Sequence, residues 1–304
     1  MSVHRALAPA KINLGLFLGP TREADGRHQL VSVMQSISLA DELTLELAPA
    51  GSSEDQVLCP SLPGPSHENL AAVALEAFRG RTGWDAPPLL LSIEKRIPVA
   101  AGLGGGSADA AAALRLARHM SGLGDEELLL ELAGELGADV PAQVSPGRWL
   151  ATGAGERLEA LPDPRGPFAV VVLPSTLALS TAAVYAEADR LGEGRSGDEL
   201  GRLEAELAAA LAQGEPLPGA VELLQNDLQR PALSLCPETA DALARVEEAG
   251  AEMALVSGSG PTVLGLFRGS SEEQQQAREA LRGIEPTPIW ARPVGAAFGR
   301  AVTL

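Results

Sequence analysis

The sequence predicts an α+β protein, and three observations support this fold class. Isoleucine and leucine occupy every second position from 12 to 18, which is the period-two pattern of a strand. The runs 107–121 and 126–136 are rich in alanine and leucine and are typical of helices. Beyond residue 167, strand and helix patterns alternate along the chain.

In the first half, further strands are expected where apolar or alternating runs lie between turn residues. The polar segment 20–28 contains an Asp-Gly pair and predicts an exposed loop before the next strand. The expected strands are 31–37, 43–47, a short one at 56–59, 88–93, and two within 149–161 that a glycine turn connects.

Three helices are expected in the first half, at 69–79, 107–121 and 126–136. Asn69 and Asp125 precede the first and third helix and belong to the residue types that cap a helix through a side-chain oxygen. Ser107 or Asp109 is expected to cap the second helix, and Gly137-Ala138-Asp139-Val140-Pro141 is expected to end the third.

The second half begins with a change in composition at the proline-rich segment 162–167. We therefore predict two domains, residues 1–161 and 162–304, with the boundary at this segment. The expected strands are 168–173, 252–256, 262–267 and 288–294; the expected helices are 181–191, 198–212, 221–225, 237–248 and 272–281.

Composition narrows the possible partners. The 304 residues include 23 lysines and arginines against 40 aspartates and glutamates, a formal charge of −17, which argues against nucleic acid or an anionic membrane as partner. Only two cysteines occur, and the amino-terminal segment has no long apolar run, so we expect a cytoplasmic protein that does not span a membrane. A phosphate site in such a chain must be built from backbone amides and a few cations.

A glycine-rich segment between a predicted strand and a predicted helix indicates a phosphate site. It runs from Pro98 to Asp109 and has four glycines within five residues, at 102 and 104–106. Glycine lets the backbone approach an anion, and the amides that begin a helix favour phosphate. The segment matches neither the Walker pattern nor G-x-G-x-x-G. The alternative is a turn before a purely structural helix.

Other residues have chemistry that suits phosphoryl transfer. Lys11 and Asn13 lie two apart on a strand and share a face, and Asp139 lies at a junction where Pro141 biases Val140 away from helical geometry. A lysine can stabilise a transferring phosphoryl group, and a carboxylate can accept the proton of an alcohol. Each residue alone is also compatible with an ordinary solvated side chain. The Ser257-Gly258-Ser259-Gly260 loop is either a second phosphate cradle or a tight hairpin.

Six short motifs, taken in order, resemble one superfamily. They are residues 9–14 (PAKINL), 25–28 (DGRH), 95–107 (KRIP through GLGGGS), 137–141 (GADVP), 226–228 (NDL) and 257–262 (SGSGPT). Each motif is weak alone, but the six together resemble the galactokinase, homoserine kinase, mevalonate kinase and phosphomevalonate kinase superfamily. Within it, the GLGGGS and ADVP forms resemble the 4-diphosphocytidyl-2-C-methyl-D-erythritol kinase family.

The resemblance implies a two-domain small-molecule kinase fold, with an amino-terminal domain like domain 2 of ribosomal protein S5 and a ferredoxin-like carboxy-terminal domain. It implies ATP-dependent phosphorylation of the 2-hydroxyl of 4-diphosphocytidyl-2-C-methyl-D-erythritol in the non-mevalonate isoprenoid pathway, with Lys11 and Asp139 as the catalytic pair. The implied nucleotide contacts are Asn69, Lys95, Pro98, Gly102, Leu103, Gly104, Gly105, Gly106 and Ser107. The implied contacts to the cytidine diphosphate polyol are Asn13, Asp25, Arg27, His28, Thr181 and Tyr185.

Two residues depart from the family pattern. Arg27 stands where the family has a tyrosine that stacks on cytosine, although a guanidinium plane can also stack on a base, with Tyr185 on the other face. Ala108 replaces a serine of the glycine loop.

We expect magnesium to be carried by ATP without a dedicated protein ligand, and the chain to be a monomer or a homodimer. The alternatives are a kinase of the same superfamily for homoserine or mevalonate, and a nucleotide-binding module without catalysis.

Overall fold

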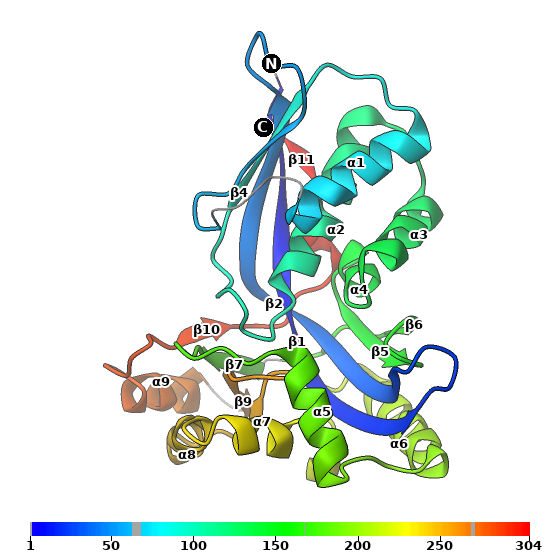
Figure 1. Ribbon diagram of the computed structural model, residues 1–304. Helices are drawn as coiled ribbons and strands as arrows, with labels where there is room; N and C mark the ends of the chain where they lie inside the picture. Colours follow the sequence, from blue (N-terminus) through cyan, green and yellow to red (C-terminus); the bar gives the residue numbers. More distant parts are fainter. Residues whose placement is uncertain (1, 63–67, 167, 269–270) are drawn as a thin grey trace.

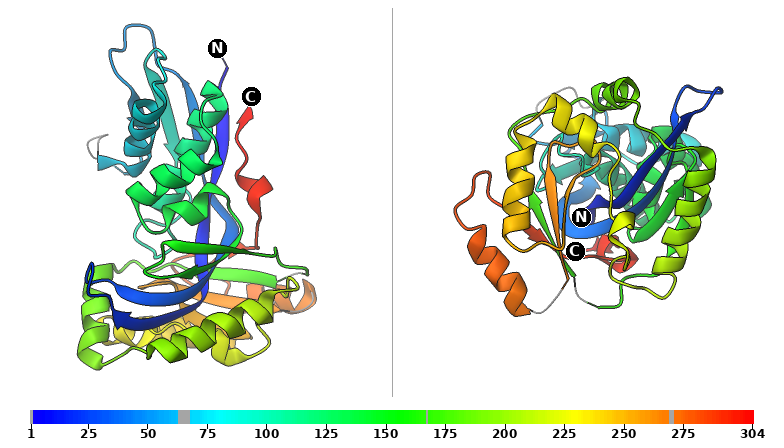
Figure 2. Two further views of the ribbon diagram at one scale, coloured as in Figure 1. Left: turned by 90° about the vertical axis from the view of Figure 1, so that its right-hand side faces the viewer. Right: turned by 90° about the horizontal axis from the view of Figure 1, so that it is seen from below.

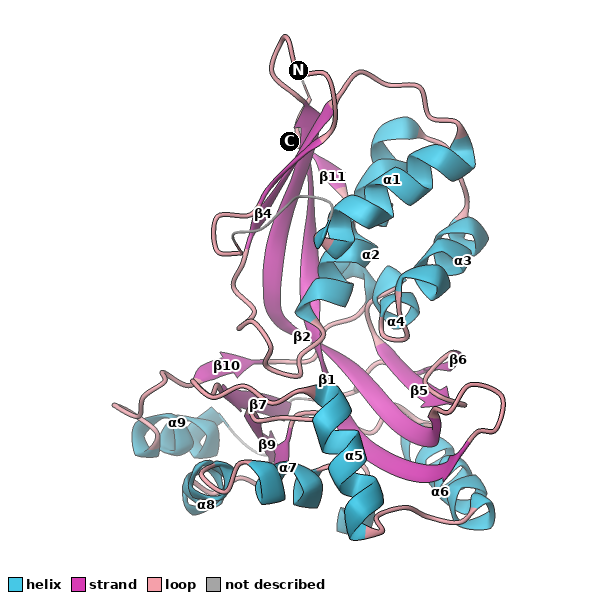
Figure 3. Ribbon diagram, in the orientation of Figure 1, coloured by secondary structure: helices cyan, strands magenta, loops and turns pink. Residues whose placement is uncertain are grey.

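The computed structural model describes residues 2–62, 68–166, 168–268 and 271–304. These residues form two β-sheets with helices packed on them, which confirms the α+β class (Figure 3). The strands are β1 (His4–Thr21), β2 (His28–Leu47), β3 (Gln56–Leu58), β4 (Leu89–Glu94), β5 (Arg148–Thr152), β6 (Arg157–Leu161), β7 (Phe168–Leu173), β8 (Met253–Val256), β9 (Val263–Arg268), β10 (Ile289–Ala291) and β11 (Val302–Thr303). The helices are α1 (Leu70–Thr82), α2 (Gly105–Ser121), α3 (Glu126–Leu136), α4 (Val140–Val144), α5 (Thr181–Leu191), α6 (Gly197–Leu211), α7 (Gln229–Leu235), α8 (Thr239–Glu248), α9 (Ser271–Ala280) and the short 3-10 helices η2 (Val221–Leu223) and η3 (Ala296–Gly299).

Two long antiparallel strands, β1 and β2, form the spine of the larger sheet. Its order is β11-β1-β2-β4-β3, and the β5–β6 hairpin pairs with the other end of β2. The separate strands expected at 31–37 and 43–47 are one continuous strand of 20 residues. Register shifts interrupt the β1–β2 ladder, as between Pro9 and Lys11, and both strands bend on their way from the upper to the lower part of the molecule (Figure 2, left).

Helices α1 to α4 lie together on one side of the upper part of this sheet (Figure 1). The side chains of Ala110 to Ala113 in α2 are all buried, and their small size lets the helix approach β1 and α1 closely. The apolar cluster around them includes Leu43 and Leu45 of β2 and Leu89 and Leu91 of β4. The alanine-rich composition of α2 therefore reflects tight packing on the sheet.

The smaller sheet has the order β10-β7-β9-β8 and is antiparallel throughout. Alternate residues of β7 point into two different clusters, because successive side chains of a strand face opposite ways. Val171 packs with residues of α5, α7, α8 and α9, whereas Val170 and Val172 pack with α6 and with Ile12 and Leu14 of β1. The smaller sheet is thus covered by helices on one face and by α6 and the end of the large sheet on the other.

Several local expectations were wrong. Helix α2 begins at Gly105 with Gly104 as its N-cap, so Ser107 and Asp109 lie inside the helix and do not cap it. Val140 is not held out of helical geometry: it begins α4, in which Pro141 occupies the first turn, where its missing amide hydrogen costs nothing.

Four short elements were not predicted: α4, α7, η3 and β11. β11 pairs with β1, which places the two ends of the chain side by side (Figure 1). The caps Asn69 and Asp125 are as expected, accepting from Ala71 N and Leu128 N at 2.9 Å each. Within the ranges given above, no helix is both long and apolar enough to cross a membrane.

Candidate active site

A cavity of about 820 Å³ is lined by residues of β1, of β2 and of the loops and helices around them. It brings together many of the residues that the sequence predicts for the site, from the glycine loop, β1, the loop between β1 and β2, the start of β2, the residue before α4, and α5. Those lining it are Lys11, Asn13, Arg27, His28, Gly102, Gly104, Ser107, Asp139, Thr181 and Tyr185.

Lys11 and Asp139 form an ion pair in the wall of this cavity. Lys11 Nζ lies 3.4 Å from Asp139 Oδ2 and donates a hydrogen bond of 2.9 Å to Asn13 Oδ1. Asn13 in turn donates to Ser32 Oγ at 2.7 Å, which fixes its amide so that the oxygen faces the lysine. The Lys11 side chain is 9% exposed and that of Asp139 is 33% exposed, so the carboxylate is the open member of the pair.

The position of Asp139 follows from the unpredicted helix α4. Asp139 is the residue before the first turn of that helix, but its carboxylate accepts no capping hydrogen bond. One carboxylate oxygen is therefore available to a ligand in the cavity while the other faces Lys11.

The glycine loop forms one wall. Lys11 N donates to Leu103 O at 3.0 Å, which attaches the loop to β1, and the stem of Lys11 lies against Gly104, where an added Cβ would be 3.0 Å from Cγ. Gly102 and Gly104 have φ of +71° and +67°, values that favour glycine. The first amides of α2 have no partner within the helix, so this wall offers hydrogen-bond donors to an anion.

The loop 257–260 lies against the glycine loop. Ser257 Oγ donates to Gly102 O at 3.2 Å, and Ser259 Oγ lies 3.0 Å from Thr181 Oγ1 at the edge of the cavity. Asn226, from the NDL motif, holds the loop by donating to Val256 O and Gly258 O at 2.8 and 2.7 Å. Two small-residue loops that lie far apart in sequence thus meet at one place.

The opposite end of the cavity is aromatic and charged. The rings of His28 and Tyr185 have centroids 5.7 Å apart, and Arg27 donates to Ala154 O at 2.9 Å. His28 Nδ1 lies 3.0 Å from Gly19 O and Nε2 lies 3.0 Å from Asp189 Oδ1. Burial, and then the charge of Asp139, raise the pKa of Tyr185 above its usual range. The phenol is therefore neutral and near the ion pair.

Several predicted site residues do not line the cavity. Asp25 is paired with Arg22 in the exposed turn, and Asn69 caps α1. The Lys95 ammonium lies between two buried carboxylates. Pro98, Leu103, Gly105 and Gly106 belong to the loop or the start of α2 but lie outside the wall as well.

The sequence did not identify some residues of the wall. Asp189 reaches the cavity from the last turn of α5, and an acidic residue on a helix carries no local signal of a binding role. Ser32 and Gly155 belong to strand β2 and to a turn between β5 and β6. Gly258 and Ser259 did have a signal, the second small-residue loop, which left a phosphate cradle and a hairpin as alternatives.

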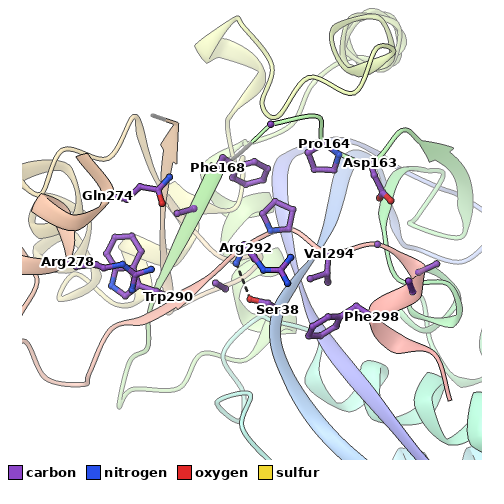
Figure 4. A pocket seen from close by; sticks show the side chains of 17 residues that line it. Ser38, Asp163, Pro164, Phe168, Gln274, Arg278, Trp290, Arg292, Val294 and Phe298 are labelled. Atoms are coloured by element: carbon purple, nitrogen blue, oxygen red, sulfur yellow. Dashed lines mark hydrogen bonds between the residues drawn. The ribbon is translucent and has the colours of Figure 1, made fainter. Parts of the chain in front are cut away.

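A second cavity, of about 930 Å³, contains none of the predicted residues (Figure 4). It lies where the segment after β10 crosses β2, and Arg292 N donates to Ser38 Oγ at 3.1 Å there. Arg278 stacks over Trp290 at 4.3 Å on its other side. This cavity is a crevice between the two sheets and is separate from the Lys11–Asp139 pair.

The donor set of the first cavity suits the phosphates of a nucleotide. Three or more histidine, cysteine, aspartate or glutamate side chains placed to hold a metal ion are not found in the part of the chain that the structure describes. Unpaired helix amides beside a lysine–aspartate pair can instead bind phosphate and accept a proton from an alcohol.

Known proteins share both halves of this chain. The model of the GHMP kinases N terminal domain matches residues 69–147, and that of the GHMP kinases C terminal matches residues 195–285. A 4-diphosphocytidyl-2-C-methyl-D-erythritol kinase of Streptomyces coelicolor is 45% identical over 262 residues, which cover 84% of each chain. One from Anaeromyxobacter dehalogenans is 41% identical over 305 residues, covering 98% of this chain and 88% of the relative.

Solved structures agree. A crystal structure of 4-(cytidine 5'-diphospho)-2C-methyl-D-erythritol kinase matches with a TM-score of 0.71 and 34% identity, covering 98% of this chain and 97% of the other. A homoserine kinase from Cytophaga hutchinsonii has a TM-score of 0.70 at 17% identity, covering 100% and 97%, and shows likeness of fold alone. The two-domain kinase fold that the motifs predicted is confirmed.

Proposed function

Since this chain belongs to the 4-diphosphocytidyl-2-C-methyl-D-erythritol kinase family of the GHMP kinases, we propose that its cavity transfers a phosphoryl group from ATP to the 2-hydroxyl of that substrate. The chain is an ATP-dependent small-molecule kinase of isoprenoid precursor synthesis. The observation that supports our assignment of residues is the Lys11–Asp139 pair, which lies between the glycine loop and the aromatic end of one cavity.

In this proposal Asp139 is the proton acceptor. Its carboxylate takes the proton of the substrate hydroxyl as the hydroxyl oxygen attacks the γ-phosphorus of ATP. The bond from that phosphorus to the oxygen of the departing ADP breaks. Lys11, held by Asn13, pairs with this carboxylate and offsets negative charge at the reacting oxygens. The protein's contribution is then mainly orientation and electrostatics.

The ATP phosphates would bind at the wall that Gly102, Gly104 and Ser107 form. The free amides of the first turn of α2 and the positive end of its dipole favour an anion there, and the absence of a Cβ at Gly104 leaves room beside Lys11. ATP supplies the phosphoryl group, and we propose that Mg²⁺ arrives bound to its phosphates.

The cytidine would lie at the other end, between Tyr185 and Arg27, with His28 at its edge. A guanidinium plane and a phenol can both stack on a base, so in this proposal Arg27 takes the place of the stacking tyrosine of the family, opposite Tyr185. Asn13 and Thr181 line the space between the two ends.

Other features of the protein stay predictions. We divide the chain into domains at residues 161 and 162, between β6 and β7, with the β11 strand returning to the first domain. Both cysteines, Cys59 and Cys236, are free, which is in keeping with our prediction of a reducing cytoplasm. A monomer or a homodimer remains our prediction for the assembly.

One assay tests the proposed substrate. ATP consumption should be measured with 4-diphosphocytidyl-2-C-methyl-D-erythritol, homoserine and mevalonate under the same conditions. We expect turnover with the cytidine substrate and none above background with the other two. Turnover with homoserine or mevalonate alone would overturn the proposal, and ATP binding without turnover on any of the three would favour a non-catalytic module.

A further inference from the structure

A buried charged triad lies beneath the glycine loop. Lys95 Nζ donates to Asp109 Oδ2 at 2.7 Å and also to Asp41 Oδ2. The three side chains are 6%, 5% and 0% exposed, in the order Lys95, Asp109, Asp41. Burying such a group costs free energy, and removing one member leaves a buried charge without its partner. The elements that carry the three side chains are therefore held in a fixed arrangement.

The triad joins three elements that are far apart in sequence. Asp109 belongs to the second turn of α2, Lys95 follows β4, and Asp41 belongs to β2. Asp41 Oδ1 also accepts from the amides of Arg96 and Ile97 at 2.5 and 2.8 Å, which fixes the chain that leads into the glycine loop.

The ammonium also lies close to the start of α2. A Cβ built on Gly105, the first residue of the helix, would lie 3.4 Å from Lys95 Nζ and 3.2 Å from Ile97 Cγ2. A positive charge at this end of a helix is unfavourable by itself. The two carboxylates compensate for this unfavourable charge, so that the ammonium can remain packed near the first turn of α2.

We propose that Lys95 is a positioning residue, which ties Asp109 to Asp41 and so sets the orientation of the helix amides that bind the ATP phosphates. This inference rests on the proposed function, because it assigns a role within the same nucleotide site. It gives the Lys95 side chain a role other than the expected contact with adenosine, since the ammonium is paired with two carboxylates and the side chain is almost wholly buried.

The protonation of the triad agrees with a closed, water-poor site. Burial is the largest effect on Asp109, and together with the nearby Asp41 it raises the Asp109 pKa to about 7, although Lys95 opposes this. Burial alone would lower the pKa of Lys95, but the two carboxylates outweigh it and the pKa is raised. Lys95 therefore stays charged, as the tie requires.

The test separates phosphate binding from adenosine binding. Affinities for ATP, inorganic tripolyphosphate and adenosine should be measured by calorimetry on the wild type, Lys95→Met, Asp109→Ala and Asp109→Asn. Asp109→Ala removes the tie to α2 but leaves Lys95 and Asp41 as a balanced pair, so it keeps the test informative if Lys95→Met does not fold.

We expect Lys95→Met and Asp109→Ala to weaken ATP and tripolyphosphate by the same factor, about tenfold or more, with adenosine affinity unchanged. Asp109→Asn, which can still accept from Lys95, should stay within about twofold of the wild type. A loss for ATP and adenosine but not for tripolyphosphate would assign Lys95 to the adenosine side and overturn the inference. Unchanged affinities in both disruptive variants would overturn it too, whereas a wild type that binds neither ATP nor tripolyphosphate would contradict the proposed function itself.

Discussion

At the residue scale, the open carboxylate of Asp139 is the most sensitive point of the proposed mechanism. Asp139→Asn keeps the shape of the side chain but removes the base, so we expect turnover to fall by a factor on the order of a hundred or more. ATP affinity should change by less than about threefold, because the phosphate wall is intact. Steady-state kinetics and calorimetry measure the two quantities.

Asp125→Asn is a matched control for this change. Asp125 lies outside the cavity and caps α3 through Oδ1, a role that asparagine also performs. Its turnover should equal that of the wild type. If Asp139→Asn kept a rate within a few-fold of the control, Asp139 would not be the proton acceptor.

A second prediction at this scale concerns pH and Asp109. Its pKa is about 7 in the folded protein against an ordinary value of 3.8, so the folded state holds a proton that the unfolded state has already lost. The stabilisation is therefore complete below about pH 4 and is lost as the pH rises through 7. The slope cannot exceed about 1.4 kcal/mol per pH unit for one proton.

The comparison of the wild type with Asp109→Asn isolates this effect, since asparagine cannot titrate. Urea unfolding between pH 5.5 and 8.5 should show a free energy of unfolding that falls more steeply with pH in the wild type. Parallel curves for the two proteins would show that Asp109 does not carry the proton.

At this scale, the sequence predicts best the residues that belong to motifs. Lys11, Asn13, His28 and Asp139 were predicted because their neighbours match a family pattern, and all four line the cavity. Sequence reasoning missed Asp189, and it gave no sign that the Lys95 ammonium is shared by two aspartates. Those contacts join residues far apart in sequence, such as Asp41 and Lys95, and local spacing does not encode them.

At the scale of elements, the sequence predicted most helices and strands, because their caps and periodicities are local. It separated 31–37 from 43–47, although they form one strand. Asp41 lies between them, and it is buried because Lys95 and two backbone amides satisfy its carboxylate. A polar residue at this position interrupts the apolar pattern, so the sequence alone predicts two strands. It missed α4, α7 and β11, which have seven residues or fewer and give little periodic signal.

The glycine loop gives a prediction about one element packed on another. Gly102 has φ of +71°, and a Cβ there would lie 2.3 Å from Ser257 O. Gly102→Ala should therefore separate the two small-residue loops, destabilise the fold and weaken ATP binding by about tenfold or more. Urea unfolding and calorimetry with ATP measure the two effects.

Gly122→Ala is the matched control, because Gly122 follows the last residue of α2 with φ of +69°, and an added Cβ there meets no atom within 4 Å. It should cost only the backbone strain of about 1–2 kcal/mol and leave ATP affinity as it is. Equal losses of stability in the two variants would mean that contact between the loops contributes nothing.

At the scale of the whole molecule, β1 and β2 belong to every part of the core. Ala6 and Ala8 of β1 pack among helices α1 and α2, Ile12 and Phe17 pack with α6, and Leu18 packs among α5, α7 and α8. No sequence pattern announces this continuity, because the same alternation occurs in a strand confined to one domain. It follows only from the bend and the register shifts of the β1–β2 pair.

A buried arginine connects the large sheet to the segment that follows α6. Arg148 of β5 donates to Gln35 Oε1 at 2.8 Å and to the carbonyl oxygens of Glu215 and Pro216 at 2.6 and 2.8 Å. Burial lowers its pKa to about 10, which still leaves it charged at neutral pH. Its removal would leave several buried acceptors without a donor, at about 1–3 kcal/mol each.

These shared elements predict that the two parts unfold together, although chains of two domains often unfold in steps. Trp84 and Trp149 report on the part with the large sheet, and Trp290 reports on the part with the small sheet. Urea unfolding should be followed by fluorescence and by circular dichroism in Trp290→Phe and in the double variant Trp84→Phe/Trp149→Phe. In each variant we expect the fluorescence midpoint to equal the circular dichroism midpoint. Adding Arg148→Met should lower the fluorescence midpoints of both backgrounds by the same amount, because the arginine holds both parts. If the midpoint reported by Trp290 stayed in place while that of Trp84 and Trp149 fell, the two parts would be independent, and β1 and β2 would not be the common core that their packing indicates.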